Sequence, residues 1–143
     1  MTDYIPIDKT LKKVLIVDDN KDIRHLLGHI LEEAGYQVFY AHNGLQALTQ
    51  AQSQQPDLIL MDLSLPELDG WEVLKRLRNQ PMFSHIPIIA LTAFVNVKTH
   101  SKALAAGFSY YLPKPFQINE MLKVIAELLQ FNASPPPPSP TST

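Results

Sequence analysis

The stretch Val14-Leu15-Ile16-Val17-Asp18-Asp19-Asn20 decides the fold, because four consecutive apolar residues are followed at once by three polar ones. A short continuous apolar run is typical of a strand that is buried on both faces. Leu58–Met61 and Ile88–Leu91 have the same character, whereas Val38–Tyr40 and Tyr110–Leu112 are more amphipathic. We therefore predict three strands in the centre of a sheet and two strands at its edges.

Helical patterns separate these strands. The first helix is predicted from apolar residues at helical spacing, which place one apolar stripe along it: Ile23, Leu26, Leu27, Ile30, Leu31 and Ala34. Gly35 then suits the left-handed position that follows a helix. Four further helices are predicted over residues 45–54, after the capping-box pair Asp69 and Glu72, before Gly107, and from Ile118 to Leu129.

This alternation predicts an α/β fold with a five-stranded parallel sheet. The order 2-1-3-4-5 places the three most apolar strands in the centre, with helices on both faces, as in doubly wound, flavodoxin-like proteins. Residues 12–131 are expected to form this domain, after an N-terminal extension of residues 1–11. Residues 132–143 include Pro135–Pro138 and are expected to form a solvated, disordered tail, because proline fixes φ and removes a hydrogen-bond donor.

The composition excludes several classes of protein. The 143 residues are 45% hydrophobic, which is enough apolar material for one core. The net charge of -2 provides no positive field for nucleic acid, and the absence of cysteine excludes disulfides and thiolate chemistry. No apolar stretch is long enough for a membrane span or a secretory signal. We therefore expect a cytoplasmic protein that binds neither nucleic acid nor a membrane directly.

Polar side chains follow the predicted strands at one edge of the sheet. Strand one runs into Asp18 and Asp19, strand three into Asp62, strand four into Thr92 and strand five into Lys114. The carboxyl ends of parallel strands meet at the same edge, so these side chains should converge. Each acid alone could be a helix cap or a turn residue. Three carboxylates about 5 Å apart would repel by roughly 3 kcal/mol per pair at an effective dielectric constant near 20, so the set predicts a bound cation.

The ligand chemistry favours Mg²⁺, because an all-oxygen site without sulfur suits a hard cation. A carboxylate, a divalent ion, a hydroxyl and an amine together meet the needs of phosphoryl transfer to an aspartate. Asp62 stands alone at the end of the central strand and is the candidate acceptor. Asp18 and Asp19 are neighbours that are better placed to hold the ion.

Four motifs carry a resemblance to a known family: Val14 to Asn20, Leu60-Met61-Asp62-Leu63-Ser64-Leu65-Pro66 with Asp69-Gly70, Ala90-Leu91-Thr92-Ala93, and Tyr111-Leu112-Pro113-Lys114-Pro115-Phe116. Residues 12 to about 130 resemble the receiver domain of two-component response regulators, and the chain is similar to its stand-alone, chemotaxis-regulator-like members. The resemblance implies that Asp62 accepts a phosphoryl group from a phosphohistidine on a sensor histidine kinase or a histidine phosphotransfer domain.

The resemblance also implies roles for the surrounding residues. Asp19, Asp62 and the backbone carbonyl of Ser64 would hold Mg²⁺, and Asp18 would reach the ion through water. The remaining roles belong to the switch: Lys114 pairs with Asp62 and then with the phosphoryl group, Thr92 donates a hydrogen bond to it, and Tyr111 swings inward. The Lys114-Pro115 bond would be cis. A plain buried core residue is the alternative for Tyr111.

The sequence departs from the family in the stretches 94–100 and 108–110, which lack its usual acidic residues. Both stretches lie on the surface that the family uses for output, so the downstream partner is not predicted. No output enzyme or DNA-binding domain is expected after residue 131. The chain would act by changing which protein it binds, or by relaying phosphoryl to another histidine, while assisting its own phosphorylation and dephosphorylation.

Three other kinds of protein share part of this pattern. A phosphatase of the haloacid dehalogenase type needs a second acid where this chain has Ser64. A flavin-binding electron carrier needs a phosphate loop rich in Ser, Thr and Gly after strand one, where Asp18 and Asp19 would repel the phosphate. The third is a phosphorylation-independent interaction module, a pseudo-receiver, against which the intact acceptor, hydroxyl and lysine argue.

Weaker signals are interpreted as structural. His25 and His29 have metal-ligand spacing but point away from the apolar stripe, so a solvated face is favoured. Three other histidines are interpreted as surface or loop residues: His42, His85 and His100. A basic cluster on the third helix is assigned to a solvent face: Lys75, Arg76 and Arg78. Trp71 is assigned to packing.

Overall fold

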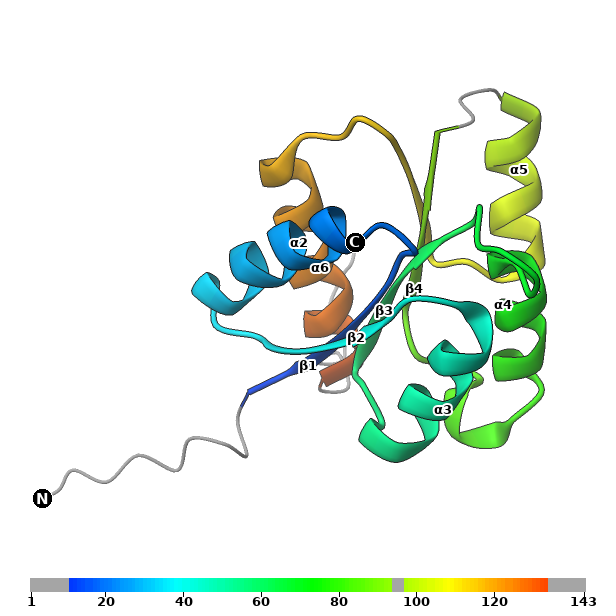
Figure 1. The fold of residues 1–143 in the computed structure, drawn as a ribbon, viewed down its shortest axis with the longest axis horizontal. Coiled ribbons are helices and arrows are strands. Elements are labelled where there is room, and N and C mark those ends of the chain that lie inside the picture. The colour runs from blue at the N-terminus through cyan, green and yellow to red at the C-terminus, as the bar shows by residue number, and fades with distance from the viewer. Residues whose placement is uncertain (1–10, 94–96, 134–143) are drawn as a thin grey trace, which may run out of the picture.

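The computed structural model describes residues 11–93 and 97–133 and confirms the predicted fold. Its five strands form one parallel sheet in the order β2-β1-β3-β4-β5 (Figure 1). The strands are β1 (Lys13–Val17), β2 (Gln37–Ala41), β3 (Leu58–Asp62), β4 (Ile88–Thr92) and β5 (Tyr110–Pro113). The apolar runs therefore lie in the three central strands, as expected of segments that are covered on both faces.

Helices cover both faces of the sheet. They are α2 (Lys21–Glu33), α3 (Gly44–Gln54), α4 (Gly70–Arg78), the 3₁₀ turn η1 (Pro81–Phe83), α5 (Val97–Ala106) and α6 (Ile118–Ala133). Figure 1 shows α2 and α6 on one face and α3, α4 and α5 on the other.

The final helix continues two residues past residue 131, while the N-terminal residues 1–10 and the Pro-rich residues 134–143 lie outside the described part. In the described residues, no helix combines the length and apolar character needed to cross a membrane.

Side-chain caps and glycines set the helix boundaries. Three capping residues accept a hydrogen bond from the backbone N–H three residues on: Asn20 from Ile23 (3.0 Å), Asn43 from Gln46 (2.7 Å) and Asp69 from Glu72 (3.0 Å). These bonds satisfy N–H groups that have no partner within the helix. Gly35 (φ 101°) takes the left-handed conformation just after α2, as predicted, and Gly107 (φ 118°) takes it just after α5.

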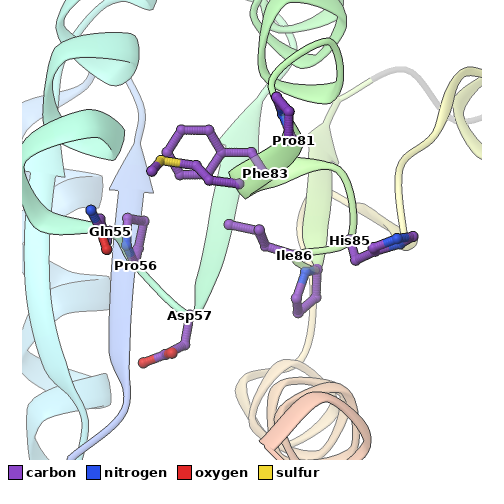
Figure 2. Close-up of a pocket in the computed structure, with 9 residues that line it drawn as sticks. Gln55, Pro56, Asp57, Pro81, Phe83, His85 and Ile86 are labelled. Atoms are coloured by element: carbon purple, nitrogen blue, oxygen red, sulfur yellow. The ribbon is translucent and has the colours of Figure 1, made fainter.

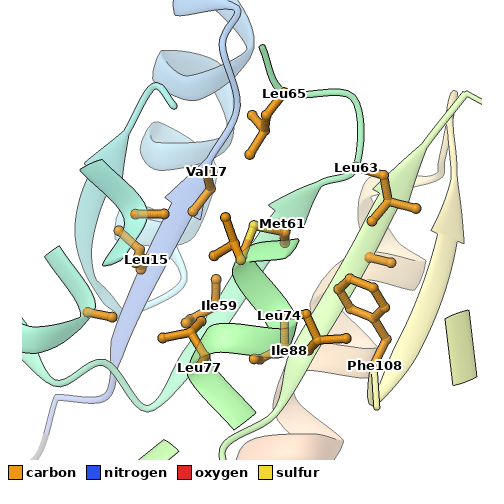
Figure 3. Close-up of a cluster of buried hydrophobic side chains, with 14 of the residues drawn as sticks. Leu15, Val17, Ile59, Met61, Leu63, Leu65, Leu74, Leu77, Ile88 and Phe108 are labelled. Carbon is orange, nitrogen blue, oxygen red and sulfur yellow. The ribbon is translucent and has the colours of Figure 1, made fainter. Parts of the chain in front are cut away.

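Two apolar clusters lie on opposite faces of the sheet. The cluster under α3, α4 and α5 includes Leu15, Val17, Ile59 and Met61 (Figure 3). The alternate residues of the same strands enter the cluster under α2 and α6: Val14, Ile16, Leu58 and Leu60. Because successive side chains of a strand point to opposite faces, a continuous apolar run supplies both clusters.

Leu26 corrects the predicted stripe on the first helix, since its side chain is 54% exposed. At 3.6 residues per turn, Leu26 lies about 100° around the helix from the buried Leu27, beyond the face that contacts the sheet. A close approach to β2 lies on the opposite side of Leu27, at Gly28, where an added Cβ atom would clash with the hydroxyl of Tyr40. The helix thus turns Gly28 toward the sheet and Leu26 toward solvent.

Arg78 corrects the predicted solvent-facing basic cluster. Its guanidinium donates hydrogen bonds to the carbonyl oxygens of Phe83 (2.8 Å), Ile86 (2.7 Å) and Gly107 (2.9 Å). It thus joins the end of α4 to the η1 segment and to the turn before β5. The five N–H donors of arginine allow one side chain to satisfy several carbonyls at once. Lys75 and Arg76 are exposed, as predicted.

Candidate functional site

Three carboxylates meet at the carboxyl edge of the sheet, as the sequence predicts. Asp18 follows β1, Asp62 ends the neighbouring strand β3, and Asp19 is the next residue after Asp18. Each offers one oxygen, and these oxygens lie within 4.8 Å of one another. Asp18 and Asp62 are only 1% and 5% exposed, whereas Asp19 is exposed. The group has the spacing and the oxygen chemistry of a site for a divalent cation.

The sheet register explains this convergence. Val17 pairs with Met61, so the next residue of each strand, Asp18 or Asp62, lies at the same level of the edge. Val17 and Met61, which precede these acids, point to the face covered by α3, α4 and α5. Because successive side chains of a strand point to opposite faces, the two acids point to the other face. Lys114 follows Pro113 at the end of β5, and by the same alternation it points to the same face as the two acids. The parallel register thus brings two acids and one amine together from three strands.

Backbone N–H groups hold both buried carboxylates in place. Asp18 Oδ1 accepts from the N–H of Asn20, and Asp62 Oδ1 accepts from the N–H of Ser64, each at 2.9 Å. The second oxygen of each carboxylate faces Lys114: its Nζ lies 3.2 Å from Asp18 Oδ2 and 3.6 Å from Asp62 Oδ2. The pair between Lys114 and Asp62 that the family resemblance implied is present, and the ammonium also pairs with Asp18, to which it lies nearer.

Two further contacts position the site and were not visible in the sequence. Arg24 of α2 donates from its guanidinium to the carbonyl oxygen of Asp18 at 2.8 Å, which ties the start of that helix to the end of β1. Gly70 begins α4 directly against β3, because a Cβ atom there would lie 2.7 Å from the carbonyl oxygen of Asp62. A glycine at residue 70 therefore allows the loop that contains Ser64 to fold back over the strand end.

The charge balance of the site shows in the pKa of Asp62. Burial raises the pKa of this carboxyl above its ordinary value, and the charges of Asp18 and Asp19 raise it further. The N–H of Ser64 and the ammonium of Lys114 act in the opposite direction but do not cancel the rise. A bound cation would favour the ionised form and lower this pKa. At Asp62, burial and the two neighbouring acids therefore outweigh the hydrogen bond and the lysine.

The raised pKa predicts a pH-dependent stability. Just above the ordinary pKa of 3.8, the folded chain binds more protons than the unfolded chain, so the free energy of unfolding falls as the pH rises through this window. In metal-free buffer we expect Asp62→Asn to be more stable than the unchanged chain at neutral pH. The expected gain is about 1 to 3 kcal/mol, because the substitution removes a charge whose burial and whose repulsion from Asp18 and Asp19 outweigh its pairing with Lys114.

This gain should shrink as the pH falls toward 3.8, because protonation of Asp62 then removes the same charge in the unchanged chain. Urea unfolding at several pH values measures it. Glu127→Gln removes an exposed carboxylate of α6 and is the matched control. A gain that does not depend on pH would contradict this account of the buried charge.

The predicted switch residues lie on the face of the sheet under α5. Thr92 ends β4 and is fully buried, and Tyr111 is 6% exposed within the apolar cluster of that face. Tyr111 pairs with Ala90, two residues before Thr92, so both side chains alternate toward the same face. The structure thus places Tyr111 in a buried position. Residues 94–96, in the stretch that departs from the family, lie outside the described part.

The weaker sequence signals have structural explanations. His25 and His29 are exposed. The rings of His25 and Tyr40 pack in a T-shaped arrangement, and His29 Nε2 lies 3.6 Å from Glu33 Oε2. The solvated face predicted for them is confirmed. Trp71 packs edge to face against Phe108, as expected of a packing residue. The Lys114-Pro115 bond is cis, as the resemblance implied.

A separate cavity of about 340 Å³ lies at the opposite edge of the sheet, where β3 and β4 begin (Figure 2). Phe83, Ile86 and three prolines supply much of its lining. Its one acid, Asp57, accepts a hydrogen bond from the backbone N–H of Lys13 at 2.8 Å. None of the predicted site residues lines this cavity, so we assign the chemistry to the acidic edge.

Comparisons with known proteins agree with this geometry. Residues 14–126 match the response regulator receiver domain family. The polar-differentiation response regulator DivK of Brucella anthropi is 38% identical over 118 residues, which are 82% of this chain and 96% of that protein. The chemotaxis protein CheY4 of Vibrio cholerae has a similar structure, with a TM-score of 0.79 and 34% identity over 83% of this chain and 99% of that one.

A third similar structure is described with a bound metal ion. The receiver domain of the sensor histidine kinase PA1611 from Pseudomonas aeruginosa superimposes with a TM-score of 0.77 and 34% identity. The match covers 85% of this chain and 99% of that one. The PA1611 receiver domain is described with a magnesium ion coordinated in its active site cleft.

Proposed function

The chain belongs to the response regulator receiver family of two-component signalling, and we propose that Asp62 is its phosphoacceptor. The protein would be a phosphorylation-activated switch that takes a phosphoryl group from a phosphohistidine and then changes its protein-binding face. One observation carries this proposal: three carboxylates with oxygens within 4.8 Å of one another face a single lysine at the edge of the sheet. The donor would be a sensor histidine kinase or a histidine phosphotransfer domain.

The donor set fits Mg²⁺, because it consists of carboxylate and carbonyl oxygens around two buried acids. Asp19, Asp62 and the backbone carbonyl of Ser64 would hold the ion, and Asp18 would reach it through water. When bound, Mg²⁺ supplies positive charge that stabilises the oxygens of the transferring group. The magnesium described in the PA1611 receiver domain supports this assignment.

In the transfer step a carboxylate oxygen of Asp62 forms a bond to phosphorus, while the bond between phosphorus and the histidine nitrogen of the donor breaks. The electron pair of that bond leaves with the histidine. The hydrogen bond from Ser64 fixes the orientation of the Asp62 carboxylate. Lys114 already lies between Asp18 and Asp62, so its ammonium needs only a small movement to contact the new phosphoryl oxygens.

The acquired group would act on the switch residues by charge and hydrogen bonding. A phosphoryl group adds a charge of about -1.5 to -2 and three strong acceptor oxygens. Thr92 would donate a hydrogen bond to one of these oxygens. The inward movement that the resemblance implies for Tyr111 would then favour further the buried position that its ring already has behind Thr92. The downstream partner is unspecified. The chain would assist its own phosphorylation and dephosphorylation without a separate output enzyme.

Acetyl phosphate with Mg²⁺, followed by intact mass, tests the acceptance of phosphoryl. The conformational response can be followed in parallel with beryllofluoride, through the fluorescence of the single tryptophan, Trp71. Trp71 lines a cavity together with Ser64 of the site loop and Lys102 of α5, and Lys102 Nζ lies 5.0 Å from the ring centroid. Movement of either segment should therefore change its emission.

We expect Lys114→Ala to accept phosphoryl at least tenfold more slowly and to lose the fluorescence response, because no other amine is placed between the two buried acids in the described part of the chain. Lys21→Ala removes an exposed lysine at the start of α2 and is the matched control. An unchanged response of Lys114→Ala to beryllofluoride would exclude the proposed role of this lysine.

A further inference from the structure

The ring of His100, on α5, is stacked on the ring of Tyr111, on β5. The ring centroids are 4.9 Å apart and the ring planes differ by 11°. His100 itself is exposed, whereas Tyr111 is buried. Ala103, one turn further along α5, is fully buried in the same apolar cluster as Tyr111. The histidine therefore stands at the solvent end of the face that α5 presents to the sheet, directly over the tyrosine.

This contact restricts Tyr111 more than a simple apolar neighbour would. Parallel aromatic rings at this distance attract each other beyond the area that they bury, and the attraction depends on their relative orientation. An aliphatic side chain at residue 100 would fill space without favouring one ring plane. The stack therefore favours one position of the Tyr111 ring, the buried one, over positions turned toward solvent.

We infer that His100 is a positioning residue for the switch: it holds Tyr111 in the buried position in the unphosphorylated chain. The inference rests on the proposed function in its second step, where Tyr111 lies behind Thr92. Tyr111 and Thr92 alternate toward the same face of neighbouring strands, so the tyrosine ring moves in the layer that the threonine occupies. If phosphorylation favours the buried ring, then a contact that holds the ring buried also favours phosphorylation, because coupling between two sites is reciprocal.

The test measures the accessibility of Tyr111 in the full chain. Nitration by tetranitromethane, with tandem mass mapping, gives separate rates for Tyr110 and Tyr111. Tyr110 alternates toward the opposite face and packs on the other apolar cluster, so it is an internal reference. We expect His100→Ala to raise the nitration rate of Tyr111 roughly two- to tenfold, the range that corresponds to the loss of one aromatic pair. His100→Phe, which keeps an aromatic ring, should restore the original rate.

His29→Ala removes another exposed imidazole, on the other face of the sheet, and should change neither rate. Three outcomes would overturn the inference: no change in His100→Ala, an equal rise at Tyr110 and Tyr111 that reports general loosening, or a rate in His100→Phe as high as in His100→Ala. A selective rise at Tyr111 that His100→Phe reverses supports it.

Nitration rates measured with and without beryllofluoride distinguish this inference from the proposed function. In the unchanged chain, beryllofluoride with Mg²⁺ should lower the nitration rate of Tyr111 further. If His100→Ala changes the rate selectively but beryllofluoride does not, the positioning role holds and the proposed switch fails. If beryllofluoride changes the rate but His100→Ala does not, the switch holds and the positioning role fails.

Discussion

Asp62→Asn is expected to abolish the mass gain of about 80 Da that acetyl phosphate and Mg²⁺ should produce in the unchanged chain. The substitution keeps the size of the side chain, and its amide oxygen can still accept from the N–H of Ser64. An amide lacks the negative charge of the nucleophile and cannot form the acyl phosphate. Intact mass spectrometry, with peptide mapping of any remaining adduct, measures the result.

Asp57→Asn is the matched control, because Asp57 precedes the same strand at its opposite end and faces the separate cavity. It should be phosphorylated like the unchanged chain. An adduct that forms equally well in Asp62→Asn would show that another residue accepts the phosphoryl group. Failure of the unchanged chain to gain mass from either acetyl phosphate or a phosphorylated histidine donor would favour the pseudo-receiver alternative.

Asp18→Asn is expected to weaken Mg²⁺ binding by roughly 10- to 100-fold, the range seen when a group just outside the directly bound ligands is changed. Asp18 is almost fully buried, so its charge is poorly screened by water. The asparagine can keep the hydrogen bond from the N–H of Asn20, so the turn after β1 should survive. The substitution therefore tests the charge of Asp18 rather than its shape.

Titration of Mg²⁺, followed by Trp71 fluorescence or by calorimetry, gives this dissociation constant. Asp22→Asn removes an exposed carboxylate from the first turn of α2 and should leave the affinity nearly unchanged. Equal affinities in Asp18→Asn and the unchanged chain would place the ion elsewhere. A similar loss in both variants would show that only long-range charge matters.

Much of the fold could be predicted from the sequence because its signals are local. Val14 to Val17 and Leu58 to Met61 are continuous apolar runs, and both are central strands. The caps at Asn20 and Asp69, and the glycine after the first helix, depend on the bonding capacity of one side chain or on its absence. Such signals act within a few residues and do not depend on the rest of the fold.

Other features could not be predicted, because they depend on how whole elements pack. Leu26 fits the apolar spacing of its helix but is exposed, since the close contact between Gly28 and Tyr40 sets the rotation of that helix. From the sequence Arg78 is one of three predicted surface cations, yet its three carbonyl partners come from two separate segments. No spacing rule relates it to the carbonyl of Gly107, 29 residues away.

By itself, the sequence determined that Asp18, Asp19, Asp62, Thr92 and Lys114 would meet at one edge of a parallel sheet. Strand direction and the handedness of the crossovers place every strand end there, whatever the side chains do. Only the tertiary structure decided which partners these residues take, including the nearer contact of Lys114 with Asp18 and the stack of His100 on Tyr111. Those choices depend on side-chain rotamers and on differences of a few tenths of an ångström between elements far apart in the chain.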